Sequence, residues 1–472
     1  MRGCPALAAL ALALVGCAQL DSAADRDAVH SDLARRVGTE LPATPADDVA
    51  VEIGSDVVAM LEEPLTEDSA VRIALLNNHD VHAAFERLGI ARADLVQAGL
   101  LRNPIFEGDA RLLFDGGTEL ELGLSQPFLD LFYRPLRERL AEHEFAAAKL
   151  LVTDDLVHLV FAVRRAFVHL RAAQQLALLH QQTLAATAAA HELAMALHTA
   201  GNTTDRALAA ERLGETRARL DLAAAEQQAL EAREPLQQLL GLWGPATAWT
   251  IVGDLADDPL AGLDTEHVEA RAITASLDLA ANRAGIDSLA QRAGLESWRG
   301  WLPDGALGLS ALRERGGDWG LGPRLALELP LFDRGAGRQT RAAARLRAGL
   351  HHHVQNAIEV RSAARLLCLR VVRLAEAVRF LRDVHLPQRA EVVRATLQHY
   401  NAMQIGAFDV LHEKQRQLAD VREYVTTLRD AHQARLDLME LLAGGSPMAA
   451  QDPGLPAATG TPGTDRSEGH AR

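Results

Sequence analysis

The chain is poor in cysteine and in aromatic residues. Only 3 of its 472 residues are cysteine, and Phe, Trp and Tyr together make up 4%. Cys4 and Cys17 lie in an N-terminal stretch that we expect to be processed, which leaves Cys368 as the remaining thiol and excludes a disulfide framework. The scarcity of aromatics, with Ala, Leu, Arg, Glu and Gln dominant, is typical of long helices rather than of compact sandwiches.

Basic charge and long apolar runs are scarce as well. The formal net charge is -15 and no basic block stands out, so nucleic acid is excluded as a partner, because phosphate contacts need such a block. No run of about 20 apolar residues follows the N-terminal stretch, so the sequence predicts no membrane-spanning helix. If the chain crosses a membrane, its strands must close into a barrel, since every backbone group is then hydrogen-bonded in lipid.

The first residues have the layout of a secretory signal. A basic Arg2 is followed by an apolar run from Ala6 to Val15, which is too short to span a membrane. The stretch Leu-Val-Gly-Cys that ends at Cys17 is similar to the lipobox of bacterial lipoproteins, in which the signal is cut before the cysteine and its thiol carries the lipid. We therefore expect a signal peptide over residues 1–16 and a palmitoylated Cys17. The alternative is an ordinary signal peptide followed by a chance cysteine.

The rest of the chain is a duplication. "RLGIARADLVQAGLLRNP" (87–104) resembles "RAGIDSLAQRAGLESWRGWLP" (283–303), and "GLSQPFLD" (123–130) resembles "ALELPLFD" (326–333). Two copies of one unit, 65–242 and 264–443, therefore follow an N-terminal segment, 17–64, and are joined by a linker, 243–263. A Pro/Gly/Ala-rich tail, 444–472, is predicted to be disordered.

Each unit is predicted to contain a helix, a β-hairpin, a long helix and a last helix. In the first unit a helix capped by Thr66 runs to about Leu101, and the strands flank a turn at Asp115 to Gly117. The long helix is expected after Pro135, up to about Ala200, and the last helix ends near Leu242. The ranges expected in the second unit are 265–297, 305–313, 321–329 around a Gly316-Gly317 turn, 336–401 and 406–443.

The long helices should pack as coiled coils. A helix of about 62 residues would be roughly 90 Å long, too long for a globular core. Apolar residues step by 4 and 3 along both, at Leu156, Val160, Val163, Phe167 and Leu170, and at Ala364, Leu367, Val371, Leu374, Val378 and Leu381. The two shorter helices of each unit should lie end to end alongside the long one.

The strands are predicted to have one apolar and one charged face. Leu120, Leu122, Leu124, Leu325, Leu327 and Leu329 lie on the apolar face, and Glu107, Asp109, Arg111, Arg324 and Glu328 on the other. A length near ten residues suits a tilted membrane crossing. Four strands are too few to close a barrel, so closure by a cyclic oligomer is the simplest solution. The alternative is a small soluble hairpin pair on a coiled coil.

Together with "LTEDSAVRIALLNNHDVHAAFERLGIARADLVQAGLLRNP", "LPLFDRG" and "YNAMQIGAFDVLHEKQRQLADVREY", this order resembles the TolC-type outer membrane efflux proteins over residues 65–443. The resemblance implies a homotrimer, mainly α-helical, with four transmembrane strands per chain closed into a β-barrel in the outer membrane lipid and an α-helical barrel in the periplasm. It implies docking on an inner-membrane pump through a periplasmic adaptor protein. It also implies that residues 18–64, residues 243–263 and the end of the last helix form a belt around the middle.

The resemblance also implies roles for single residues. The adaptor-contacting tips are Gly201, Asn202, Thr203, Ile405, Gly406 and Ala407, and Met403 stands near the place where a turn glycine is usual. Asp409 matches a position whose carboxylates constrict the pore and favour cations, although it could simply cap its helix. Glu107, Asp109, Arg111, Arg324 and Glu328 would line the barrel lumen, where mixed charge passes hydrated cargo without binding it tightly. Phe128, Phe132, Tyr133 and Phe332 are candidates for an aromatic belt at the membrane interface.

We expect neither an enzyme nor a cofactor. "HELAM" (191–195) lacks the second histidine of a metalloprotease, and consecutive His351, His352 and His353 diverge on a helix, so no metal site is expected. The expected function is a passive exit duct for small molecules. Efflux of heavy-metal ions, type I protein secretion, and a coiled-coil lipoprotein tether without a pore are the alternatives.

Overall fold

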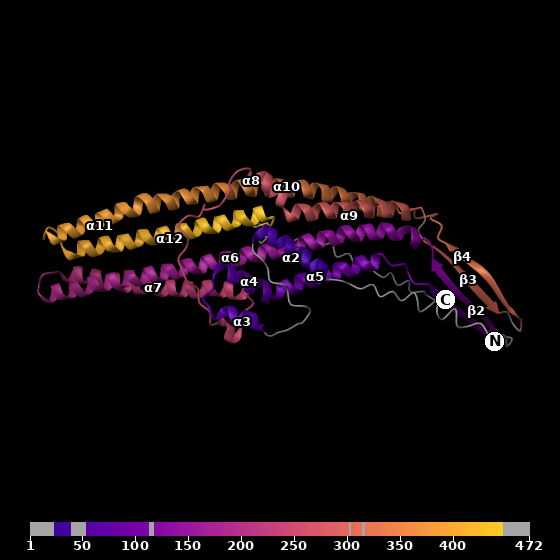
Figure 1. Ribbon diagram of the computed structural model, residues 1–472, viewed down its shortest axis with the longest axis horizontal. Helices are drawn as coiled ribbons and strands as arrows, with labels where there is room; N and C mark the ends of the chain where they lie inside the picture. The colour runs from indigo at the N-terminus through magenta and orange to yellow at the C-terminus, as the bar shows by residue number, and fades with distance from the viewer. Residues whose placement is uncertain (1–22, 39–52, 113–117, 302–303, 314–316, 447–472) are drawn as a thin grey trace.

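The computed structural model describes residues 23–38, 53–112, 118–301, 304–313 and 317–446. The chain is elongated, with a β-sheet at one end, helical hairpins at the other and shorter helices around the middle (Figure 1). The expected signal peptide, Cys17, the first hairpin turn, Gly316 of the second turn and most of the expected disordered tail lie outside the described residues.

The two units have the same element order. The first contains α4 (Glu67–Asn77), α5 (His79–Ala98), β1 (Ile105–Leu112), β2 (Thr118–Pro127), α6 (Asp130–Thr199) and α7 (Asp205–Leu239). The second contains α8 (Val268–Ala275), α9 (Leu277–Arg299), β3 (Gly305–Arg313), β4 (Trp319–Leu327), α10 (Ala336–Phe380), the π-helical turn η2 (Leu381–His385), α11 (Leu386–Asn401) and α12 (Ala407–Ala443). Outside the units lie α2 (Ala23–Val37), α3 (Ser55–Leu61) and η1 (Gly244–Thr247). No helix of this described part is long and apolar enough to cross a membrane.

The first helix of each unit is broken, which the sequence did not predict. Asn78 and Ser276 have extended backbones, with ψ of 122° and 117°, and each caps the helix that follows. The Asn78 side-chain oxygen accepts a bond from the Asp80 N–H at 2.7 Å, and the Ser276 hydroxyl accepts one from the Leu279 N–H at 3.2 Å. The single helices expected to Leu101 and over 265–297 are therefore wrong at these two points.

The breaks receive the C-termini of the last helices. The Asn77 and Asn78 side-chain amides donate to the Leu240 and Leu239 carbonyls, both at 2.9 Å, and so satisfy carbonyls at the end of α7. At the second break, Arg36 of α2 donates to the Ala275 and Ala443 carbonyls, both at 2.9 Å. The two shorter helices of each unit thus meet end to end, as expected.

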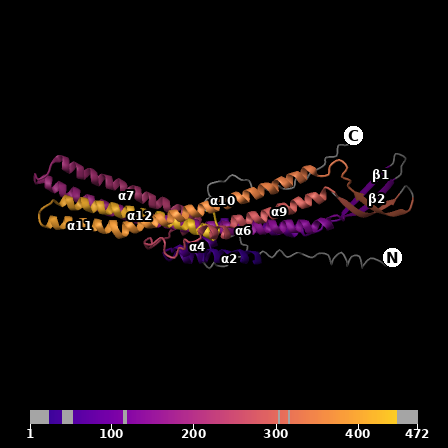
Figure 2. The same cartoon turned by 90° about the horizontal axis from the view of Figure 1, so that it is seen from above.

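The buried core lies in the middle of the molecule. The coiled-coil positions predicted on α6 from Leu156 to Leu170 are all buried, and Val371 and Val378 of α10 are fully buried. Along α7 the buried residues include Ala218, Ala225 and Ala232, one every seven residues. Small residues at heptad spacing allow α6 and α7 to approach closely, and Figure 2 shows α7 running beside the other long helices to the far end.

The sheet is antiparallel, in the order β1-β2-β3-β4. Leu122 lies opposite Gly108 on one side and Ala311 on the other, and Leu307 lies opposite Leu325. This register puts the predicted Leu120, Leu122, Leu124, Leu325 and Leu327 on one face, which confirms the predicted alternation. Leu312 of β3 lies on the opposite face, and Leu329 lies beyond the end of β4.

Two predicted boundaries at the junction of sheet and helices are wrong. β4 spans 319–327 rather than 321–329. The Glu328 N–H makes one more bond, to the Asp304 carbonyl, and the pairing cannot continue much further because Pro330 has no N–H to donate. Helix α6 begins at Asp130 rather than after Pro135. The buried Asp130 carboxylate holds this start in place, because it accepts from Arg137 at 2.6 Å and from the Arg102 N–H at 2.9 Å.

Candidate functional site

The polar face of the sheet carries most of the charged residues that we expected to line a barrel lumen. Glu107, Asp109, Arg111 and Arg324 all lie on this face by register. Arg324 of β4 reaches across the two middle strands and pairs with Glu107 of β1. A Cβ added at Gly123 would lie 3.3 Å from the Arg324 guanidinium, so the missing side chain gives this arginine its path.

Glu328 lies elsewhere, past the end of β4. It lines a cavity of about 320 Å³ at the junction of sheet and helices, together with Arg102, Asp130, Tyr133, Glu296, Arg299, Asp304 and Arg338. Burial raises the pKa of Asp130, but the hydrogen bonds from Arg137 and Arg102 outweigh it and hold that pKa below its usual value. Opposite charges thus fix the point where strands become helices.

Aromatic residues surround this junction unevenly. Phe128 and Tyr133 pack against Leu295 in a small buried cluster, so they are not free for a belt in this chain. Phe132 and Phe332 are exposed, as are Trp298 and Trp301, which the sequence reading missed. A spacing of three residues near the end of a helix was the only signal for these two tryptophans.

The hairpin tips at the other end have matched backbones. Gly201 has φ of +74° and Met403 has φ of +61°. The N–H after each bonds to the carbonyl five residues earlier, from Asn202 to Leu197 at 2.8 Å and from Gln404 to His399 at 2.9 Å. Met403 therefore occupies a left-handed turn position that glycine fills in the first tip.

The remaining predicted tip residues follow these turns. Asn202 and Thr203 lead to Thr204, which caps α7, and Ile405 leads to Gly406, the cap of α12 before Ala407. The Asp409 carboxylate accepts a bond from the Gly406 N–H at 3.0 Å. The structure therefore shows Asp409 in the capping role.

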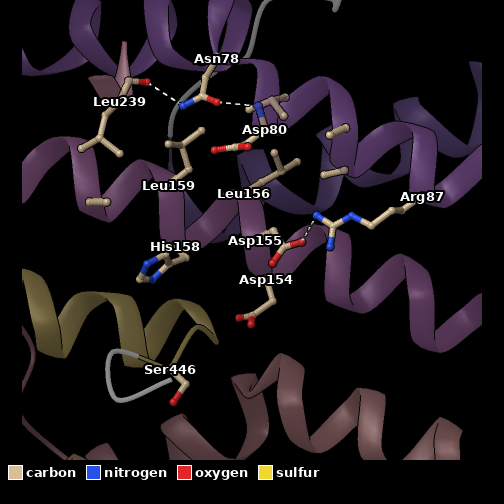
Figure 3. A pocket seen from close by; sticks show the side chains of 14 residues that line it. Asn78, Asp80, Arg87, Asp154, Asp155, Leu156, His158, Leu159, Leu239 and Ser446 are labelled. Atoms are coloured by element: carbon tan, nitrogen blue, oxygen red, sulfur yellow. Dashed lines mark hydrogen bonds and ion pairs between the residues drawn. The ribbon is translucent and has the colours of Figure 1, made fainter. Parts of the chain in front are cut away.

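A cavity of about 640 Å³ opens in the middle of the molecule (Figure 3). Asp154, Asp155 and His158 reach it from α6, and Arg87 of α5 pairs with Asp155 at 2.8 Å. Burial, and then repulsion by Asp278, raise the pKa of Asp154 to about 7. This carboxyl therefore changes its charge near neutral pH.

A buried carboxylate lies next to this cavity and joins α6 to α12. The fully buried Glu440 accepts from His158 Nδ1 at 2.8 Å and also pairs with Arg165. The hydrogen bond with Glu440 is the main cause that raises the pKa of His158. The coiled-coil pattern does not predict this network, because the partners of Glu440 are on α6, far from it in the sequence.

The histidine of the HELAM stretch pairs with a carboxylate of the neighbouring helix, because His191 Nδ1 lies 2.6 Å from Glu215 of α7. Among the described residues, no group of three or more His, Cys, Asp or Glu side chains is arranged to hold a metal ion.

Comparisons with known proteins identify the fold. No family model matches the sequence. No curated protein matches it either.

Among solved structures, CusC is 17% identical with a TM-score of 0.66, over 86% of this chain and 98% of that one. The Campylobacter jejuni CmeC outer membrane channel is 13% identical with a TM-score of 0.65, over 86% of this chain and 95% of that one. The Neisseria gonorrhoeae MtrE outer membrane channel, in its open state, is 18% identical with a TM-score of 0.64, over 80% and 89%. The expected resemblance to TolC-type proteins is thus confirmed at the level of the fold.

Proposed function

Because the chain has the fold of these outer membrane channels, we propose that it is the outer membrane channel of a tripartite efflux system. It acts as a passive exit duct for small molecules that a pump and an adaptor deliver from the inner membrane or the periplasm. Three copies form the working channel, and each contributes four strands to a barrel and its long helices to a periplasmic tunnel.

The amphipathic sheet carries this proposal. In the described strands, β1 and β4 each have only one neighbour, so both edges of the sheet keep unpaired backbone groups. Leu307, Leu321 and Leu325 on its apolar face are 55%, 76% and 61% exposed. A soluble hairpin pair would leave this leucine face in water, whereas a barrel in lipid covers the face and pairs both edges.

The polar face supports a conduit rather than a binding site. Arg324 and Glu107 neutralise each other, and the Asp109 carboxylate pairs with Arg111 at 3.3 Å. Charges that are already paired attract hydrated cargo weakly, which suits rapid passage of varied molecules. We propose the matched tips at Gly201 and Met403 as the adaptor contacts, and Cys17 as the lipid anchor in the outer membrane.

Planar bilayer recording tests the proposal. Purified full-length protein in detergent should insert and give discrete ion conductance, and chemical cross-linking should give a ladder that ends at three chains. Arg324→Gln should change the ratio of cation to anion permeability without abolishing conductance. A monomeric protein that never conducts would instead match the tether.

A further inference from the structure

Four histidines recur at a fixed interval along α6. His158, His169, His180 and His191 are each 11 residues apart, which is three helical turns, so they follow one face of the helix with a small drift. Neither the channel fold nor the coiled-coil pattern requires histidine at these positions. Three of them lie along the contact between α6 and α12, and the fourth faces α7.

The partners of these histidines change along the contact. At the central end, His158 faces the buried carboxylate of Glu440 at 2.8 Å. Farther toward the tips, His180 Nδ1 lies 3.1 Å from the guanidinium of Arg422. Because arginine can only donate, Nδ1 of His180 must accept this bond and therefore carry no proton.

From this geometry we infer that the contact between α6 and α12 is a proton-sensitive hinge, in which acidification releases the tip half of α12 while the central half stays attached. A proton on His180 turns its acceptor into a donor and puts a second positive charge beside Arg422. A proton on His158 strengthens its pair with Glu440. The same proton uptake therefore weakens one end of the contact and reinforces the other.

The other charged groups around these histidines set the direction of the response. Around His158, the hydrogen bond with Glu440 raises the pKa and outweighs Arg165, which opposes protonation, while Asp154 favours it. Burial, and then Arg422, lower the pKa of His180, while Asp221 of α7 partly opposes this. Burial and Arg429 likewise lower the pKa of His169, against Asp430, but the His169 side chain is exposed and its effect is smaller. For a histidine whose folded pKa is lowered, the contact loses stability as pH falls below the ordinary value of about 6.5.

The central end has further anchors. Gln433 donates to the Arg165 carbonyl at 2.8 Å and Arg36 holds the Ala443 carbonyl, and neither bond involves a histidine. His432 bonds the Ala256 carbonyl at 2.7 Å, and because burial lowers the pKa of His432, acidification weakens this one central contact. At the tip half, His412 of α12 lies 3.2 Å from Glu211 of α7. This pair opposes release, because a proton on His412 strengthens its attraction to the carboxylate.

Thiol accessibility in the full-length protein tests the hinge. Leu418 and Val425 lie one turn before and after Arg422 and are 5% and 8% exposed. In a Cys368→Ala background, maleimide labelling of Val425→Cys is measured at pH 7.5 and 5.5, with the labelled site verified by peptide mapping. The exposed position Lys414→Cys corrects for the effect of pH on thiol reactivity, and Leu438→Cys, at a fully buried central site, reports on general loosening.

We expect the corrected labelling at position 425 to rise severalfold on acidification, with no rise at position 438. His180→Gln should abolish most of this rise, because a glutamine oxygen accepts from Arg422 at either pH, and His412→Gln should enlarge it. Thermal melting at pH 7.5 checks that both variants are folded. An acid response that is absent, that persists in His180→Gln, or that is equal at position 438 overturns the hinge.

The hinge would open the tunnel tip only if the channel function proposed above holds. Bilayer recording of the same variants separates the two ideas. Accessibility that responds to pH without any conductance supports the hinge and rejects the channel, whereas conductance with accessibility that ignores pH rejects the hinge and leaves the channel.

Discussion

Met403 has a backbone conformation that usually requires glycine. It takes a left-handed φ of +61° and leaves 94% of its surface exposed, whereas Gly201 takes the same turn without a side chain. A non-glycine residue in this region is strained by roughly 1 kcal/mol or more. Met403→Gly should therefore raise the protection of the Gln404 amide against hydrogen exchange severalfold, and Gly201→Met should lower that of the Asn202 amide. Unchanged protection in both variants would show that the turns carry no strain.

Asp154 should make stability depend on pH near neutrality. Its pKa is about 7 in the folded chain and about 3.9 when unfolded. Above pH 7 the folded state therefore buries a charge, and as pH falls from 7 toward 4 it gains a proton that the unfolded state does not bind, so stability rises. Asp154→Asn should raise the melting temperature most at pH 8 and much less at pH 5, where the folded state is already protonated. An equal shift at both values would exclude this titration as the cause.

Sequence patterns located single residues only where a local rule governs them. Thr66 caps its helix, as expected, and Gly201 takes the positive φ that ends one. The Arg324 and Glu107 pair was out of reach, because it depends on the order of four strands drawn from both units. The regular spacing of His180 can be read from the sequence, but its hydrogen bond cannot, because the partner Arg422 lies 242 positions away.

Among the elements, β4 offers the sharpest test of the sheet. Leu325 lies opposite Leu307 of the neighbouring strand β3, and Ala326 lies next to Leu325 on the opposite face. A lysine on the lipid face near mid-membrane costs about 2–4 kcal/mol, so Leu325→Lys should reduce heat-modifiable trimer in isolated membranes. Ala326→Lys is the matched control and should assemble normally. Leu327→Lys should have a smaller effect, because Leu327 ends the strand and the cost falls near the interface.

The element α2 should stabilise the second unit through a single side chain. Arg36 bonds the Ala275 and Ala443 carbonyls at once, where α8 and α12 end. Hydrogen bonds from a charged donor are worth about 1.5–3 kcal/mol. Arg36→Leu should therefore lower the melting temperature and expose the end of α12 to proteolysis. Arg35→Leu is the control, since Arg35 is exposed and pairs only with its own helix. Similar losses in both variants would argue against the clamp.

The order of the elements and the hydrophobic periodicity of strands and helices could be predicted from the sequence, but the interruptions of the helices could not. Strand alternation and heptad steps are local in sequence, and they gave β1 to β4 and the long helices within a few residues. The interruptions at Asn78 and Ser276 depend on helix ends more than 160 residues away, which meet them in space. The π-helical turn at Leu381–His385 likewise lies within a pattern that continues through it.

At the scale of the whole molecule, a single chain leaves a row of apolar side chains exposed on α10. Leu350, Val354 and Ile358 form a row along α10, one turn apart, and are 48%, 58% and 55% exposed. If three copies close into a tunnel, this row becomes an interface between chains. Burying one such side chain is worth about 1.5–3 kcal/mol, and the symmetry of a ring repeats that gain at every interface.

Val354→Glu should consequently weaken assembly. The carboxylate would be buried without a partner at each of the interfaces, so the trimer should give way to monomers in detergent, measured by native mass spectrometry. Gln355→Glu adds the same charge at the next residue, about 100° around the helix, where the exposed Gln355 bonds only Glu359 of its own helix. This control should remain trimeric. If both variants assemble alike, α10 faces the periplasm instead, and the contact between chains must run along another helix.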